Sequence, residues 1–257
     1  MERKEKLIEL TNVSQVFGTS SDSLHVIQNI DLSIYQQEFV CVVGPSGCGK
    51  STLLKMIAGF LTPTLGECHM SGELITGPDK RRGVVFQSPT LYPWLTVEAN
   101  VAYGLKIGRL PKKEQEERVN HYLTEVGLLE FKKRYPFELS GGMKQRVAIG
   151  RTLVNHPELI LMDEPFSALD AITRVGMQEM LRKIWKEKEQ TIFMITHDIE
   201  EALKLGTRIL VMSKNPGVII SEFETNYTEK ISLNKTYHPE EDQDFQKDKL
   251  KLFELIS

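Results

Sequence analysis

The sequence predicts an α/β domain, and three observations carry that prediction. An apolar run at 39–43 leads directly into the loop GPSGCGKST at 44–52, which opens into a helical pattern. Helical patterns recur along the chain, with short apolar runs between them that resemble strands buried on both faces of a parallel sheet. Alternating strands and helices form layered α/β domains. The apolar runs are at 84–86, 159–162, 192–195 and 209–212, and the helical patterns are at 53–59, 141–155, 173–188 and 198–205.

The bulk composition narrows the class of protein. With 257 residues, 40% of them hydrophobic, the chain can bury a core. Its 32 basic and 35 acidic residues are well mixed, so no basic face indicates nucleic acid. The start MERKEKLIEL lacks the apolar core of a signal peptide, and no apolar stretch approaches the ~18 residues of a membrane span. Three irregularly spaced cysteines fit a reducing compartment. We therefore expect a subunit that stays in the aqueous phase.

Near the N-terminus the sequence predicts a small antiparallel sheet. Residues 7–17 and 30–35 alternate apolar with polar residues, and the turn-forming cluster Gly18–Asp22 separates them. Phe17 closes the first of these strands. It either stacks on an adenine ring or packs in the core, and the residue alone favours neither.

The loop at 44–52 predicts a phosphate site. Its spacing fits G-x-x-x-x-G-K-[ST], placed between a strand and a helix as the motif requires. Backbone N–H groups at the helix start suit phosphate, Lys50 can reach the β- and γ-phosphates, and the Ser51 hydroxyl suits Mg²⁺. The expected nucleotide-binding residues here are Gly44, Pro45, Ser46, Gly47, Cys48, Gly49, Lys50, Ser51 and Thr52.

An inserted subdomain is expected at 92–156, because two of the predicted strands are separated by some seventy residues, too many for one crossover. Thr96 can cap a helix that runs to about Ile107. Pro111 suits the first turn of a second helix, Gly127 ends it, and a third helix starts at Ser140. The tail at 223–257 is polar until a terminal amphipathic piece, and we expect it to dock on the core through Phe245, Leu250, Phe253 and Ile256.

Polar side chains stand at the carboxyl ends of three predicted strands, the edge at which α/β sheets bind ligands. Asp163 and Glu164 end one strand, where Asp163 suits Mg²⁺ and Glu164 suits a general base for water. Gln87 can orient water or contact Mg²⁺. His197 could reach the γ-phosphate, although a lone histidine is more often structural.

The stretch LSGGMKQR at 139–146 predicts a second anion-binding helix start. Ser140 is a suitable N-cap, and the two glycines that follow, Gly141 and Gly142, exceed what a cap needs. Two such devices in one chain suggest one nucleotide held between two copies.

Together these stretches resemble the nucleotide-binding subunit of an ABC transporter, over about residues 7–220. LSGGMKQR is similar to that family's signature motif, GPSGCGKST to its Walker A, LILMDEP to its Walker B, and SALD, ending at Asp170, to its D-loop. Gln87 and His197 match its Q-loop and switch histidine, and Phe17 its adenine-stacking aromatic. Longer segments, such as ITGPDKRRGVVFQSPTLYPWLTVEANVAYGL and MSKNPGVI, resemble importer ATPases of the nitrate, sulfonate and taurine group. Gln37 and the pair Phe137–Glu138 depart from the usual residues of that group.

The resemblance implies a P-loop NTPase core of RecA-like fold, formed by 1–91 and 157–222 with the N-terminal β subdomain, and a helical signature subdomain at 92–156. It implies an ATPase that uses ATP and Mg²⁺, with catalytic Glu164, His197, Gln87 and Lys50. Ser51, Gln87 and Asp163 would bind the metal. In a head-to-tail dimer, Ser140 and Gly142 of one copy would close on ATP held by the other, and Asp170 would contact across the interface.

Further partners follow from the resemblance. These are a membrane permease, contacted near Leu91–Leu95, and a periplasmic or surface solute-binding protein, with the ATPase peripheral on the cytoplasmic face of the membrane. Alternatives are another importer subgroup, an exporter, or a soluble ABC ATPase acting on ribosomes or DNA, although those soluble enzymes resemble paired domains or carry long coiled coils. A P-loop kinase would leave LSGGMKQR unexplained.

Overall fold

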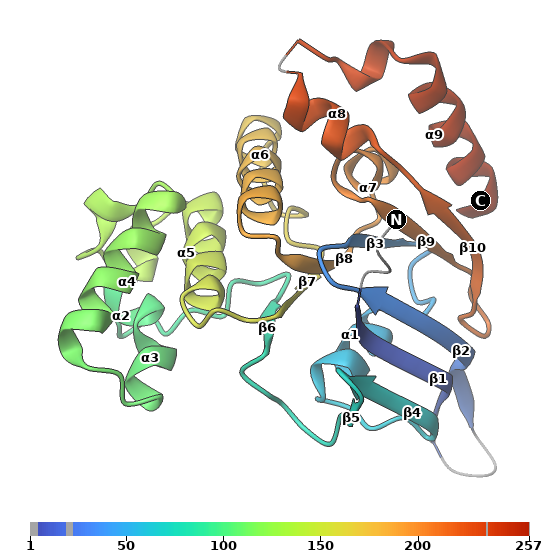
Figure 1. Cartoon of the computed structure of the whole chain (residues 1–257), viewed down its shortest axis with the longest axis horizontal. Helices are drawn as coiled ribbons and strands as arrows, with labels where there is room; N and C mark the ends of the chain where they lie inside the picture. Colours follow the sequence, from blue (N-terminus) through green and yellow to red (C-terminus); the bar gives the residue numbers. More distant parts are fainter. Residues whose placement is uncertain (1–4, 19–22, 235, 257) are drawn as a thin grey trace. The chain divides into compact units, whose positions relative to one another are not determined.

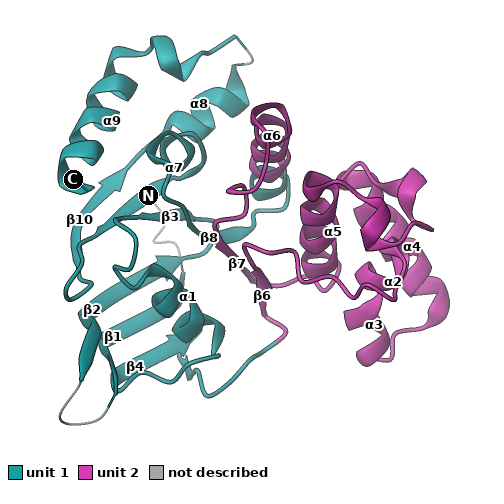
Figure 2. Ribbon diagram, turned by 180° about the vertical axis from the view of Figure 1, so that it is seen from behind, with its two compact units in different colours: residues 1–79, 184–257 teal, residues 80–183 magenta. Residues whose placement is uncertain are grey.

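The computed structural model describes residues 5–18, 23–234 and 236–256. These form two compact units, one from residues 1–79 and 184–257 and the other from 80–183, coloured separately in Figure 2. We refer to them as unit 1 and unit 2. The turn predicted at 18–22 lies outside the described residues except for Gly18.

Unit 1 contains the predicted N-terminal antiparallel sheet, in the order β2-β1-β4-β5 (Figure 1). Its long strands β1 (Lys6–Phe17) and β2 (Leu24–Tyr35) pair antiparallel. The sheet also contains β4 (Leu65–Met70) and β5 (Glu73–Leu74), which the sequence patterns did not predict. The first half of β4 is exposed, so it lacks the alternation that marks a half-buried strand.

A second sheet of unit 1 carries the phosphate loop. Strand β3 (Phe39–Val43) lies between β8 (Thr191–Ile195) and β9 (Arg208–Met212) and runs parallel to both. Every residue of β3 and β8 is buried, which explains why these runs are apolar throughout. Strand β10 (Ile219–Glu224) adds antiparallel to β9. Helices α1 (Lys50–Ala58) and α7 (Ile199–Leu205) follow β3 and β8.

The C-terminal tail docks on unit 1, but not through all the expected residues. It forms α8 (Tyr227–Leu233), a short 3₁₀ turn at Pro239–Glu241 and α9 (Gln243–Ile256). Phe245 and Leu252 are fully buried, whereas Leu250 and Phe253 remain more than 60% exposed. The prediction was therefore wrong for Leu250 and Phe253. The buried positions are seven residues apart, and they define one face of the helix.

Unit 2 combines two parallel strands with helices. Strands β6 (Arg82–Val85) and β7 (Leu159–Asp163) pair in register, and α6 (Ala171–Glu187) begins in this unit and ends in the other. The described elements at 92–156 are all helical: α2 (Val97–Val101), α3 (Tyr103–Ile107), α4 (Lys112–Glu125), α5 (Gly141–Leu153) and 3₁₀ turns at Leu129–Phe131 and Pro136–Glu138.

Two details of unit 2 refine the expectations. The Thr96 side chain caps α2 by accepting from the Ala99 N–H, as expected. The helix then breaks at Ala102 instead of continuing to Ile107, and the weak helix formers Tyr103 and Gly104 follow the break.

Candidate functional site: a phosphate loop and a second helix start

The phosphate loop joins β3 to α1, and its backbone requires glycine. Gly47 and Gly49 have φ of 79° and 97°, a region that side chains with a Cβ rarely adopt. Gly49 is the N-cap residue of α1, so the free N–H groups of the first helical turn come directly after the loop. Ser46 and Gly47 are exposed, whereas Cys48 is buried.

Lys50 is fixed by the loop itself. Its side chain is only 7% exposed, and its ammonium group donates to the carbonyl oxygens of Gly44 at 2.7 Å and Pro45 at 3.0 Å. A third contact, to the Cys48 sulfur, is 3.6 Å long. The cation therefore lies within the curve of the loop, where a phosphate chain bound by the loop would meet it.

Gly217 presses against this loop, although it belongs to none of the predicted motifs. A Cβ on Gly217 would lie 2.0 Å from the Cys48 carbonyl oxygen, and its N–H donates to the Val26 carbonyl at 3.0 Å. The only sequence signal for this contact was the segment MSKNPGVI, which we quoted for its resemblance and not for a role.

Two other predicted residues of unit 1 are accessible. Phe17, at the end of β1, is 43% exposed, so one part of its ring is open to a partner. His197, directly after β8, is also exposed, and Asp198 beside it caps α7 by accepting from the Glu201 N–H. Phe17 is therefore not a buried core residue, which was the alternative to stacking on adenine.

In unit 2, the structure brings Gln87 and Glu164 together. The Gln87 amide N–H group lies 3.4 Å from a Glu164 carboxylate oxygen and 3.3 Å from the Ser167 hydroxyl. Ser167 in turn donates to the Glu164 carbonyl at 3.0 Å. The sequence predicted Gln87 and Glu164 separately but gave no sign that Ser167 joins them. Asp163 ends β7 one residue earlier, half-buried.

The backbone at Glu164 is unusual. Its φ is 46°, in the left-handed region that residues other than glycine seldom occupy. Such conformations typically cost about 1–3 kcal/mol and concentrate at functional sites. Ser167 stabilises this conformation, because both its N–H and its hydroxyl donate to the Glu164 carbonyl.

The second helix start is built as expected around Ser140. The Ser140 side chain accepts from the Met143 N–H and so caps α5. Gly142 is buried, and a Cβ there would lie 2.4 Å from the Thr173 methyl group, so packing alone explains this glycine. Our argument that both glycines exceed structural need was therefore wrong for Gly142. It still applies to Gly141, where an added Cβ would meet no described atom within 4 Å.

Asp170 is the N-terminal residue of the turn that starts α6. Its carboxylate accepts from the Thr173 N–H at 3.0 Å, and hydrogen bonds from Thr173 lower the pKa of the carboxyl below its usual value. The group is exposed, so the same carboxylate can also meet a partner.

Comparison with known proteins adds the deciding observation. Residues 27–167 match the family described as ABC transporter. The chain belongs to the ABC transporter family. It is 47% identical, over 93% of its length and 90% of the relative's, to the nitrate import ATP-binding protein NrtD of Synechocystis sp.. It is also 47% identical to the taurine import ATP-binding protein TauB of Roseobacter denitrificans, over 86% of this chain and 83% of the relative.

A solved structure supports the assignment of the fold. The dimeric structure of a post-hydrolysis state of the ATP-binding cassette MJ0796 bound to ADP and Pi matches with a TM-score of 0.76 at 34% identity, covering 85% of this chain and 98% of that one. The chain is thus an ABC-type ATPase with the P-loop NTPase fold, as the motifs implied. Among its described residues, no helix is long and apolar enough to cross a membrane.

This ABC cassette also presents an aromatic cluster in unit 2. The ring of Tyr92 lies 4.4 Å from that of Tyr103 and 5.6 Å from that of Trp94, and the Arg151 guanidinium lies 5.6 Å from the same Tyr92 ring. Arg151 also donates to the Thr90 carbonyl. The cluster is therefore held in place, yet Trp94 is 70% exposed.

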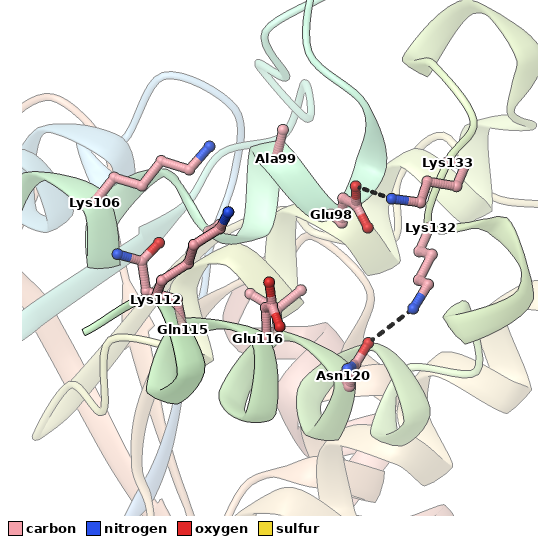
Figure 3. A pocket seen from close by; sticks show the side chains of 11 residues that line it. Glu98, Ala99, Lys106, Lys112, Gln115, Glu116, Asn120, Lys132 and Lys133 are labelled. Carbon is pink, nitrogen blue, oxygen red and sulfur yellow. Dashed lines mark hydrogen bonds and ion pairs between the residues drawn. The ribbon is translucent and has the colours of Figure 1, made fainter. Parts of the chain in front are cut away.

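A pocket of about 380 Å³ lies among the helices of unit 2 (Figure 3). Lys106, Lys112, Lys132 and Lys133 line it together with Glu98 and Glu116. Two of the lysines are engaged, because Lys133 pairs with Glu98 and Lys132 donates to Asn120. None of the predicted site residues lines this pocket, so it is separate from the nucleotide-binding motifs.

Proposed function

We propose that this cassette couples ATP hydrolysis to the uptake of a small oxyanion or sulfonate, of the nitrate and taurine kind, through a separate membrane permease. The relatives named above support this solute class. The ATPase subunit does not itself select the solute. The proposed solute class therefore rests on the similarity to these relatives over nearly the whole chain.

The observation that carries the proposal is that one chain contains two glycine-bearing helix starts of the kind that suits an anion. One is the glycine loop that curves around Lys50, and the other is the helix start at Ser140 with the unobstructed Gly141. In a head-to-tail dimer the first would hold ATP and the second, from the other copy, would cover its γ-phosphate. Phe17 would stack on the adenine, and Asp170 would contact the partner copy.

The residues proposed for the metal fit Mg²⁺. The Ser51 hydroxyl, the Gln87 amide oxygen and the Asp163 carboxylate are hard oxygen donors, which Mg²⁺ prefers. In Gln87 the amide N–H group faces Glu164 and Ser167, which leaves its oxygen for a cation. When bound, the ion would neutralise charge on the β- and γ-phosphates.

The remaining residues have roles that follow from their chemistry. Glu164 accepts the proton of the attacking water as general base, and its hydrogen bond from Gln87 orients the carboxylate. Lys50 stabilises charge on the phosphates. His197, on its exposed turn after β8, contacts the γ-phosphate.

Two further partners complete the proposal. The aromatic cluster around Trp94 receives the permease, which positions the cassette at the cytoplasmic face of the membrane. A periplasmic or surface solute-binding protein delivers the solute to that permease.

The test uses Glu164→Gln. This change keeps the shape of the side chain and removes the base, so ATP should bind without being hydrolysed and the closed dimer should accumulate. Light scattering of the variant under saturating ATP should report twice the mass found without nucleotide. A monomer under the same conditions would refute the proposed dimer, and unimpaired hydrolysis would refute the role of Glu164.

A further inference from the structure

The turn that carries His197 is closed by a ring of hydrogen bonds. The Thr196 hydroxyl donates to a Glu201 carboxylate oxygen at 2.6 Å, and the Asp198 N–H donates to the same hydroxyl at 3.1 Å. The Glu201 N–H donates back to the Asp198 carboxylate at 3.1 Å. The residues on both sides of His197 are thus fixed by one another.

The ring is buried although His197 is not. Thr196 is 2% exposed and Glu201 is 5% exposed. Burying a carboxylate is costly unless hydrogen bonds stabilise its charge, and an apolar side chain would serve packing better. The Thr196 hydroxyl supplies such a bond to the Glu201 carboxylate and so ties the turn at His197 to helix α7.

The same turn is tied to the strand that leads into the phosphate loop. The Thr196 N–H donates to the Val42 carbonyl at 3.1 Å, and Val42 stands two residues before Gly44. This hydrogen bond holds the backbone next to His197 beside the end of β3, which leads directly into the phosphate loop of unit 1.

Helix α7 is also held from outside by the C-terminal tail. The Lys249 ammonium of α9 lies 2.5 Å from a Glu200 carboxylate oxygen, and Lys204 of α7 lies 2.6 Å from Glu240. The hydrogen bond from Lys249 lowers the pKa of Glu200 below its usual value. Glu200 belongs to the first turn of α7, beside Glu201.

We propose that Thr196 and Glu201 are positioning residues for His197, and that helix α9 steadies the same turn through the pair Lys249–Glu200. This inference rests on the proposed contact between His197 and the γ-phosphate. It gives the tail a role in hydrolysis, because the tail limits the movement of the turn that bears the histidine.

The first experiment compares Thr196→Val with Thr196→Ser in steady-state ATP hydrolysis by the full chain. Valine keeps the volume and removes the hydroxyl, so kcat should fall about tenfold because small displacements of a reacting group have large effects. KM for ATP should stay within about twofold, because the phosphate loop is unchanged. Serine should restore kcat.

The matched control is Thr228→Val. Thr228 is fully buried in α8, and its hydroxyl has no hydrogen-bond partner among the described residues. The same substitution there should leave kcat unchanged. Should Thr196→Val not fold, Glu201→Met removes the acceptor from the other end of the bond and should give the same loss.

His197→Ala separates the two hypotheses. If His197→Ala lowers kcat and Thr196→Val does not, the positioning role is wrong. If His197→Ala hydrolyses ATP at the rate of the unchanged chain, the proposed role of His197 itself is wrong. The double variant Thr196→Val with His197→Ala should be no slower than His197→Ala alone, since the ring acts only through the histidine.

The second experiment tests the tail with Lys249→Glu. Two carboxylates would then face each other, so kcat should fall about threefold at low salt, and the loss should shrink in 0.5 M salt as the repulsion is screened. Lys247→Glu makes the same charge change beside Asp244, on the exposed pair of α9, and should have no effect. Equal rates for the two variants would overturn the role of α9.

Discussion

At the scale of single residues, the phosphate loop depends on contacts from distant parts of the chain. Gly44 meets β9, because a Cβ there would lie 2.4 Å from the Met212 carbonyl oxygen. Gly217 approaches the Cys48 carbonyl still more closely. The carbonyl groups of Met212 and Cys48 thus leave no room for a side chain at positions 44 and 217. Packing against Met212 and Gly217 therefore helps to fix the curve of the loop around Lys50.

Gly217→Ala should therefore weaken nucleotide binding although it replaces none of the phosphate-loop residues. The added methyl group collides with backbone, so the loop or the 215–218 turn must shift, and overpacking of this kind destabilises by about 1–3 kcal/mol. We expect the Kd for an ATP analogue, measured by calorimetric titration, to rise at least about fivefold.

Gly77→Ala is the control for this change. An added Cβ at Gly77 meets no described atom within 4 Å, so affinity should be unaltered. An unchanged Kd in Gly217→Ala would show that the loop adapts to the methyl group at no cost to binding.

At the scale of elements, helix α9 is attached to its unit by few side chains. Phe245 packs edge-on against Tyr227 with ring centroids 5.1 Å apart, and Leu252 is buried two turns later. The Tyr227 hydroxyl donates to Asp248 of α9 at 2.6 Å, and burial together with this bond raises the pKa of Tyr227 well above its usual value. Helices α8 and α9 thus form one attached pair.

Phe245→Ala should detach this pair. Removing a fully buried phenyl ring typically costs about 3–5 kcal/mol of unfolding free energy, which urea denaturation would measure. Phe253→Ala removes the same ring from a position that is 62% exposed, and surface changes of this kind stay within about 0.5 kcal/mol. Comparable losses in the two variants would contradict the assigned face of α9.

The strands of the two units and helix α9 show which elements the sequence could predict and which it could not. The buried strands β3, β7, β8 and β9 were evident, because strands covered on both faces must be apolar throughout. Strand β10 was missed because its sequence IISEFE does not alternate apolar with polar residues: Ile220 is exposed, and Ser221 lies on the half-buried face. For α9 the sequence indicated docking through Phe245, Leu250, Phe253 and Ile256, whereas in the structure the buried residues are Phe245, which packs against Tyr227, and Leu252.

The candidate site residues likewise fall into those that sequence motifs predicted and those that only the structure reveals. The glycines, Lys50 and Glu164 were recognisable because chemistry demands those residue types at those spacings. Ser167, Thr196 and Glu201 act through hydrogen bonds that cross turns, and no local pattern marks them. The close approach of Gly217 to Cys48 joins positions 169 residues apart, which no periodicity reveals.

At the scale of the whole molecule, the predicted site residues are divided between the two compact units. Unit 1 holds the phosphate loop, Phe17 and His197, and unit 2 holds Gln87, Glu164, the Ser140 helix start and Asp170. Gln87 lies five residues before Tyr92, and the aromatic cluster follows it directly. A permease bound at that cluster would therefore act on the segment that also orients the proposed general base.

Trp94→Ala tests this arrangement. The indole is mostly exposed, so its loss should leave folding and ATP binding intact while removing an anchor for the permease. We expect the tagged variant to bind ATP normally and to lose the integral membrane protein that co-purifies with the unchanged chain. Phe253→Ala, an exposed aromatic on α9, should retain that protein. Retention by Trp94→Ala as well would exclude the cluster as the docking site.

The left-handed backbone at Glu164 has a consequence for how this chain tolerates change. Glycine or asparagine would occupy a φ of 46° with less strain than glutamate does. Stability alone therefore favours losing the carboxylate, while the proposed role of Glu164 as general base requires it. A search for more stable variants of this protein that did not also select for activity would be drawn to position 164, and if Glu164 is the general base it would yield better folded proteins that no longer turn over ATP.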